Sequence, residues 1–150
     1  MLVKRSSMFR FQLIKWFSSF HKYVLIKSNG RLMHNLLGHN MLLLENVGRK
    51  TSQIHQTPLL YIKSSESTFL TVGSFGGHPK HPAWFLNIKD IKKTNLIVKG
   101  KKLSVDIHIL SGNEKKEAWR KLVLEYPGFS RYQEKTSRPI PVIEFTVSND

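Results

Sequence analysis

Apolar residues recur with a helical period near the start of the chain. Between Met8 and Lys27 they are Phe9, Leu13, Trp16, Phe17, Phe20 and Val24. The opposite side of the same stretch carries Lys15, Ser18, Ser19 and Lys22. This pattern predicts a basic amphipathic helix within residues 1–30. Such a helix either packs its apolar stripe on the rest of the protein or lies in a membrane interface, and both placements stay open.

Further along, short apolar runs separated by turn residues predict strands. The predicted strands are Met41–Glu45, Thr57–Lys63, Thr68–Gly73, Asn95–Lys99, Leu103–Leu110 and Val142–Val147. The turns at residues 64–67 and 100–102 are short enough to join their neighbouring strands as two hairpins. The first of these hairpins would pair Thr57–Lys63 with Thr68–Gly73.

Helices are expected between these strands. A short one is expected over Arg31–Leu37, a second from Pro82 to about Asp90, and a third from the capping box of Ser111 and Glu114 to Glu125. Strands joined mostly by hairpins, with helices inserted, indicate an α+β, mainly β protein. We expect a six-stranded antiparallel barrel with flanking helices, formed as one domain by residues 31–150.

Composition removes several classes of function. The 150 residues contain no cysteine, which excludes disulfides, thiolate metal sites and a cysteine nucleophile. Lys and Arg number 24 against 10 Asp and Glu, a formal charge of +14, and no acidic residue precedes Glu45. This charge favours an anionic partner or is simply a solvated basic face. Nucleic acid is disfavoured, because no recognition motif accompanies the charge.

The basic N-terminal segment fits poorly to a cleaved secretory signal or a membrane span, because Lys15 and His21 interrupt its apolar run. Its acid-poor composition also suits an organellar transit peptide, a minor alternative.

Several polar motifs could carry chemistry. Gly48-Arg49-Lys50-Thr51 combines a turn with two cations and a hydroxyl, which suits phosphate or carboxylate. His78 and His81 lack a neighbouring third ligand, so no metal site is expected. Tyr126, Phe129 and Tyr132 recur every third residue and could line the mouth of a pocket or close the core. No serine–histidine–acid set or carboxylate pair indicates hydrolysis.

Six motifs follow one another at characteristic intervals between about Leu42 and Phe145. They are Gly48-Arg49-Lys50-Thr51, Thr57-Pro58-Leu59, Gly73-Ser74-Phe75-Gly76-Gly77, His81-Pro82-Ala83-Trp84-Phe85-Leu86-Asn87, Tyr126-Pro127-Gly128 and Arg138-Pro139-Ile140-Pro141. In this order they resemble the deazaflavin (F420)-dependent nitroreductase and quinone reductase family. The resemblance implies a split β-barrel of the kind found in pyridoxamine-phosphate oxidases. It also implies hydride transfer from reduced coenzyme F420 to a quinone, nitroaromatic or activated enone.

The resemblance also implies roles for particular residues. Arg49, Lys50 and Thr51 would hold the anionic cofactor tail. The rest of the cofactor would contact His55, Gln56, Thr57, Pro58, Leu59, Leu60, Val72, Gly73, Ser74, Phe75, Ala83, Trp84, Phe85, Leu86 and Asn87. Ser74 and Tyr126 are the catalytic candidates, which would stabilise charge on the acceptor. Phe129 and Tyr132 would lie on the substrate side.

Three positions depart from the family pattern. His55 stands where arginine is frequent, Phe75 where lysine is frequent, and Phe129 where a tyrosine is expected. FMN is therefore kept as the alternative cofactor, with a non-catalytic cofactor- or lipid-binding module as the alternative function. The expected partners are a small-molecule electron acceptor, a membrane surface touched by the N-terminal helix, and a second copy in a homodimer. The expected location is the cytoplasm, including the inner face of the membrane.

Overall fold

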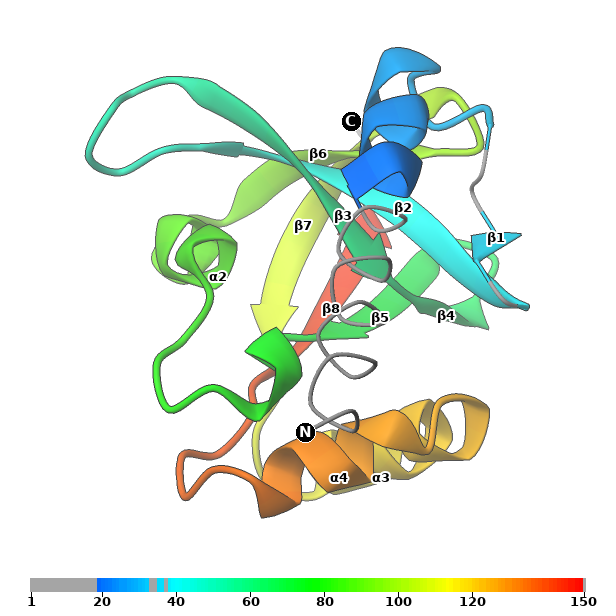
Figure 1. The fold of residues 1–150 in the computed structure, drawn as a ribbon. Helices are drawn as coiled ribbons and strands as arrows, with labels where there is room; N and C mark the ends of the chain where they lie inside the picture. The colour runs from blue at the N-terminus through cyan, green and yellow to red at the C-terminus, as the bar shows by residue number, and fades with distance from the viewer. Residues whose placement is uncertain (1–18, 33–34, 37, 150) are drawn as a thin grey trace, which may run out of the picture.

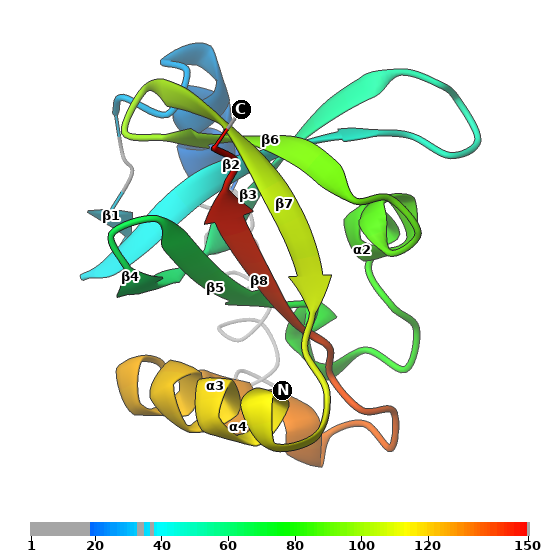
Figure 2. The same cartoon turned by 180° about the vertical axis from the view of Figure 1, so that it is seen from behind.

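The strands of the computed structural model, which describes residues 19–32, 35–36 and 38–149, form one antiparallel sheet. They are β1 (Asn35–Leu36), β2 (His39–Val47), β3 (Ile54–Leu60), β4 (Ile62–Ser65), β5 (Thr68–Val72), β6 (Lys93–Val98), β7 (Lys101–Ile109) and β8 (Val142–Val147). Hydrogen bonds connect them in the order β1-β2-β6-β7-β8-β5-β4, and β3 pairs with β2. The sheet curls on itself into the split β-barrel that the sequence predicts (Figures 1 and 2).

The described residues form eight strands where the sequence predicts six, because one predicted strand is two and β1 forms where a helix is predicted. The chain changes partner at Tyr61: β3 pairs with β2, with Pro58 opposite Leu43, and β4 pairs with β5. The predicted pairing of Thr57–Lys63 with Thr68–Gly73 is therefore wrong for its first half. Thr71 Oγ1 donates to the Leu60 carbonyl at 2.6 Å, across the split between β3 and β5.

The short helix expected over Arg31–Leu37 is wrong in its described residues. Asn35–Leu36 forms β1 instead, paired with His39 and Asn40 of β2. The Asn35 side chain accepts a hydrogen bond from the Gly38 N–H at 3.1 Å, a local bond that stabilises a turn in competition with helix.

Strand β2 is buried on both faces, which explains its unbroken apolar run. Leu42 and Leu44 join the core cluster of the barrel interior, whereas Met41 and Leu43 pack against Leu25 on the outside. A strand covered on both faces loses the usual alternation of apolar and polar residues.

The helices cover the outside and one end of the barrel. Helix α2 (Ala83–Ile88) lies on its side, and α3 (Gly112–Glu125) and α4 (Gly128–Glu134) close one end together (Figures 1 and 2). Helix α3 has Ser111 at its N-cap and ends at Glu125, as predicted. The capping bond from the Ser111 side chain is absent, since Gly112 begins the helix with a φ of +55°. Helix α4 was not predicted.

Residues 19–27 form a helix on the outer face of β2. Its inner side consists of His21 and Leu25, which are buried, while Phe20 and Tyr23 are 54% and 60% exposed. The predicted apolar residues before residue 19 lie outside the described part of the chain. No helix of the described residues is long and apolar enough to cross a membrane.

We expect Leu25→Ala to lower the free energy of unfolding by about 3 kcal/mol, because it empties a site enclosed by Met41, Leu43 and Ile97. Tyr23→Ala, on the exposed side of the same helix, is the matched control and should change it by less than about 0.5 kcal/mol. Urea unfolding followed by tryptophan fluorescence measures both. Equal losses in the two variants would contradict docking of this helix on the barrel.

Candidate functional site

A cavity of about 470 Å³ opens where β3, β5, the start of α2 and the α3–α4 junction meet. Strand β3 contributes Pro58, Leu59 and Leu60 to its wall. Val72 of β5, Ser74, Phe75 and Trp84 form a second side. Tyr126, Phe129 and Tyr132 form the third. Residues that the sequence predicts to act together therefore do share one cavity, drawn from four separate stretches of chain.

The tyrosines add hydroxyls to a wall built mainly from apolar and aromatic residues. The hydroxyls of Tyr126 and Tyr132 lie 3.4 Å apart. This hydrogen bond, together with burial and the proximity of the second phenol, raises the pKa of Tyr126. A phenol is protonated at neutral pH in any case, and the raised pKa holds this proton more firmly, so Tyr126 remains a hydrogen-bond donor.

The unpredicted helix α4 explains the spacing of these aromatics. The Tyr126 and Phe129 rings meet edge to face with centroids 4.8 Å apart. Phe129 is buried in the cluster between α3, α4 and the barrel, so it serves both the core and the cavity wall. The sequence left open whether these aromatics line a pocket or close the core, and the structure shows that they do both.

The glycine-rich loop between β5 and α2 is held by Arg138. The guanidinium donates from Nη2 to the Ser74 carbonyl at 2.7 Å and from Nε to the His78 carbonyl at 2.8 Å. Its Nη1 lies 3.3 Å from Nδ1 of His81. Burial and the neighbouring Arg138 charge lower the pKa of His81, so the neutral imidazole, which can accept from Arg138, is favoured.

The same loop packs directly on α4. A Cβ at Gly77 would lie 2.5 Å from the Tyr132 carbonyl oxygen, so only glycine permits this approach. The short 3₁₀ segment η1 (Phe75–Gly77) thereby fixes the loop against the helix that carries Tyr132. The cavity wall formed by this loop is therefore fixed to the wall formed by α4.

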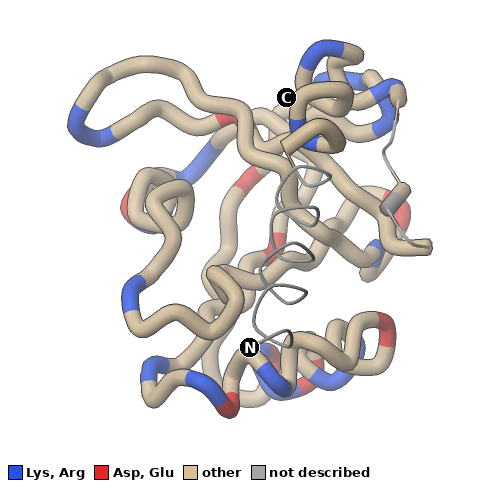
Figure 3. Tube along the Cα trace, viewed as in Figure 1, with Lys and Arg blue, Asp and Glu red and all other residues tan. Residues whose placement is uncertain are grey.

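The predicted anion site lies at the tip of the β2–β3 hairpin, which extends beyond the barrel beside α2 (Figure 1). Arg49 and Lys50 are exposed there, and the tip is blue in Figure 3. The side-chain oxygen Oδ1 of Asn87, on α2, accepts from the Arg49 backbone N–H at 3.2 Å and from its Nη1 at 3.1 Å. Thr51 Oγ1 lies 3.4 Å from His55 Nε2 within the same turn.

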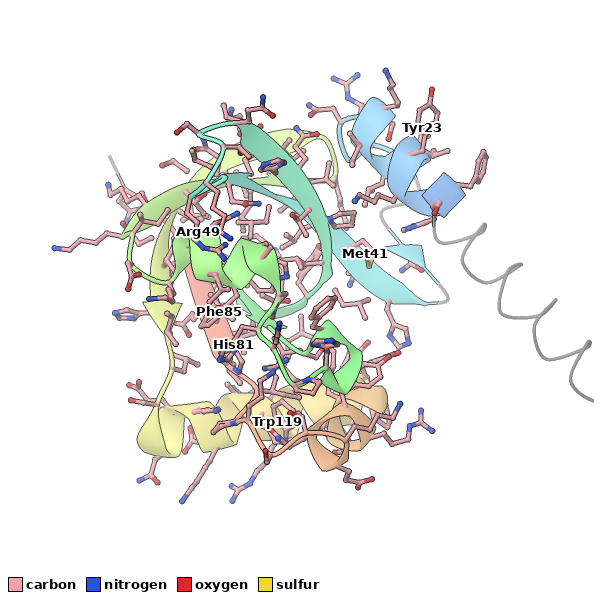
Figure 4. All side chains as sticks on the ribbon, turned by 60° about the vertical axis from the view of Figure 1, so that its left-hand side comes forward. Tyr23, Met41, Arg49, His81, Phe85 and Trp119 are labelled. Atoms are coloured by element: carbon pink, nitrogen blue, oxygen red, sulfur yellow. The ribbon has the colours of Figure 1, made fainter. Side chains whose placement is uncertain are left out.

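A buried amide anchors this turn. Asn46 accepts from Asn87 Nδ2 at 2.7 Å and donates to the Thr57 hydroxyl at 3.3 Å. Trp84 and Asn87 are three residues apart on α2 and so lie on the same side of it. This side of α2 therefore reaches from the cavity at Trp84 to the hairpin tip at Asn87. Figure 4 shows Arg49 close to this helix, with Phe85 and His81 nearby.

The remaining predicted residues do not border the cavity. Gln56 pairs with Glu45 at 3.3 Å, and the Gly73 N–H donates to the Pro141 carbonyl at 2.9 Å. Phe85 is buried in the barrel core and Leu86 packs on that core, while Ala83 is exposed. His55 and Thr57 contact Asn46 through the hydrogen bonds of the hairpin.

Sequence reasoning missed Met41, Thr71 and Gly76 as lining residues, and Arg138 and Asn46 as supports. For Arg138 a signal existed, namely a single cation before a Pro-Ile-Pro stretch. Asn46 gave a weaker one, as a polar residue at the end of a buried leucine run.

Size alone does not single this cavity out. A hollow of about 640 Å³ lies over β7 and β8, lined by Asp106, His108 and Glu144 among others. It contains none of the predicted site residues. In the described part of the chain, no three His, Asp or Glu side chains gather to hold a metal ion.

Comparisons with known proteins identify the family of the chain. The family model of F420H(2)-dependent quinone reductases matches residues 18–146. An F420H(2)-dependent quinone reductase of Mycobacterium tuberculosis is 34% identical over 131 residues, covering 84% of this chain and 87% of that protein.

Solved structures give the same picture. An F420-H2 dependent reductase superposes with a TM-score of 0.63 at 31% identity, covering 70% of this chain and 92% of its own. A structure described as a domain-swapped dimer has a TM-score of 0.66 at 27% identity, covering 88% and 98%. A Listeria innocua protein of the pyridoxamine 5'-phosphate oxidase type, 10% identical with a TM-score of 0.52 over 87% and 94% of the chains, shares the fold alone. The chain belongs to the F420H(2)-dependent quinone reductase family.

Proposed function

We propose that this protein is an F420H(2)-dependent oxidoreductase that reduces a quinone, with nitroaromatics and activated enones as further acceptors. The observation that carries the proposal is the cavity in which Pro58, Ser74, Trp84 and Tyr126 meet, beside a hairpin tip bearing Arg49. Family membership points to the same activity.

The residues present fit the cofactor. A cavity of about 470 Å³ is within the usual range for small-molecule sites, and apolar and aromatic walls suit a flat ring system. The phosphate and glutamate tail of F420 is anionic and requires cations. Arg49 and Lys50, at the Asn87 end of α2, offer them.

The chain itself supplies binding, orientation and polar stabilisation. When bound, reduced F420 provides the hydride. Tyr126, whose phenol is protonated at neutral pH, would donate a hydrogen bond to the acceptor oxygen on which charge develops. Its bond with Tyr132 orients that hydroxyl. The Ser74 side chain, which lines the same cavity, is the second candidate donor.

FMN is the alternative cofactor on this barrel. The contribution of the hairpin tip to affinity distinguishes F420 from FMN. F420 carries a longer chain of negative charge, so its affinity should depend on Arg49 and Lys50 more strongly than that of FMN.

We expect Arg49→Ala to raise the Kd for F420 about ten-fold, since a hydrogen bond to a charged group contributes about 1.5–3 kcal/mol. Lys50→Ala should act in the same direction. Lys63→Ala removes a cation that pairs with Glu66 at 3.3 Å on the β4–β5 turn, and it is the matched control. Fluorescence titration with F420 and with FMN measures all four proteins. Tighter binding of FMN than of F420 would favour the alternative cofactor.

We also propose that residues 1–30 form a membrane-contacting helix attached to a cofactor-binding barrel of residues 31–150. This would keep a cytoplasmic enzyme at the inner face of the membrane, where quinones dissolve. The support is the outward side of helix 19–27, where Phe20 and Tyr23 are exposed beside Lys22 and Lys27. Exposed aromatics among lysines suit the interface of an anionic bilayer.

A double variant, Phe20→Ser with Tyr23→Ser, should reduce binding to phosphatidylglycerol vesicles by at least about ten-fold, because each ring contributes apolar burial in the interface. Leu124→Ser is the matched control, since Leu124 is 85% exposed on α3. Vesicle co-sedimentation measures binding. An unchanged partition of the double variant would contradict lipid contact by this helix.

We propose a homodimer as the working form, supported by the solved relative described as a domain-swapped dimer. Light scattering after size exclusion should give twice the 17.4 kDa chain mass at micromolar concentration. A particle of single-chain mass would contradict it.

A further inference from the structure

Phe75 combines two unfavourable properties. Its backbone has a φ of +47°, in the left-handed region that residues with a side chain rarely adopt. Its ring is 56% exposed, although phenylalanine is normally buried. Glycine would satisfy this position at lower free energy. Neither the conformation nor the burial of Phe75 explains the presence of a phenyl ring here.

The surrounding structure imposes the position of the ring. Hydrogen bonds from Arg138 hold the carbonyls of Ser74 and His78, on either side of Phe75. Within the loop, the Gly77 N–H donates to the Ser74 carbonyl at 2.9 Å and the His78 N–H to the Phe75 carbonyl at 3.1 Å. Backbone strain that is maintained in this way at a cavity indicates a functional constraint.

The ring borders the cavity at its α4 side. Phe75 belongs to η1, which packs on α4 through Gly77 and Tyr132. The hairpin tip with Arg49 lies at the other end of α2. A ligand whose anionic tail binds Arg49 would therefore leave the Phe75 side, near the tyrosine hydroxyls, to its reaction partner.

The described ring that Phe75 contacts is His78, with centroids 4.9 Å apart and planes tilted by 41°. His78 supports the ring from one side and leaves much of it exposed. Phenyl rings bind flat conjugated rings by offset or edge contacts, whereas their negative faces offer no favourable contact to an anionic acceptor.

We propose that Phe75 is the specificity-determining residue for the electron acceptor: an aromatic wall, held in a strained conformation, that selects planar uncharged rings such as naphthoquinones. This rests on the proposed function for its identification of the ligand as an acceptor.

The experiment compares Phe75→Gly, Phe75→Leu and Phe75→Tyr with the wild type. Calorimetric titration with menadione gives a Kd that needs no cofactor, and steady-state kinetics with reduced F420 gives KM and kcat. Thermal unfolding gives Tm. Lys99→Gly is the matched control, because Lys99 also has a positive φ, of +49°, but borders a different hollow.

We expect Phe75→Gly to raise Tm by a few degrees, because it relieves the strained conformation, and to raise the Kd and KM for menadione about ten-fold. Phe75→Leu should also raise the Kd for menadione, but with a smaller rise in Tm than Phe75→Gly. Phe75→Tyr should keep the Kd for menadione within about two-fold of the wild type. Lys99→Gly should raise Tm and leave the Kd for menadione unchanged. The proposal assigns Phe75 to the acceptor instead of the cofactor contact that the family resemblance implies, so the Kd for F420 should stay within about two-fold in every variant.

An unchanged Kd for menadione in Phe75→Gly would overturn the proposal. A large rise in the Kd for F420 without one for menadione would overturn it too, because the ring would then serve the cofactor. Absence of F420 binding by the wild type would instead defeat the proposed function, and the menadione titration would still decide the role of Phe75.

Discussion

The guanidinium of Arg138 fixes the geometry on which the rest of the site depends. The loop that follows β5 has positive φ at Phe75, Gly76 and Gly77, and such a segment does not maintain its own conformation. Arg138 binds two carbonyls and one imidazole of this loop. Burial lowers the pKa of Arg138, but a guanidinium stays charged at any physiological pH. Arg138 therefore holds the loop as a cation throughout the physiological pH range.

Arg138 is itself positioned from α4. Gln133 donates to the Arg138 carbonyl at 2.9 Å and accepts from the Ile140 N–H at 2.9 Å. The loop after β5, helix α4 and the segment before β8 therefore form one unit, although His78 in the loop is 60 residues from Arg138. This unit holds Ser74 and Phe75 at fixed positions relative to Tyr132 of α4. A binding site with such support loses less conformational entropy when a ligand enters.

The local elements could be predicted from the sequence where a residue pattern is unambiguous. The strand Val142–Val147 and the end of α3 at Glu125 match the structure because apolar runs and a Tyr-Pro-Gly stop are local signals. The change of partner at Tyr61 could not be predicted, because the residues on either side continue the same apolar run. Helix α4 could not be predicted, because the proline and glycine at its start indicate the end of the preceding helix, although a proline also suits the first turn of a new one.

The candidate site shows the same division between local and distant effects. The order of short motifs identified Ser74, Trp84 and Tyr126, and the structure brings them into one cavity. Their supports were less accessible, since Asn46 and Arg138 act on residues about 40 and 60 positions away. A hydrogen bond across such a separation leaves no spacing signal in a single sequence.

Charge acts at two ranges in this protein. The formal charge of +14 gives the whole surface an attraction for anions that salt screens within about 8 Å at physiological ionic strength. This long-range field raises the rate of encounter with an anionic cofactor but cannot orient it. Orientation requires cations at defined positions, and Oδ1 of Asn87 fixes one of them by accepting hydrogen bonds from both the backbone and the side chain of Arg49. A surface with the same net charge but a free hairpin tip would attract F420 as quickly and release it sooner. On the proposed role of Arg49, the Asn46–Asn87 pair would contribute to affinity through the residence time of the cofactor, although neither amide needs to touch it.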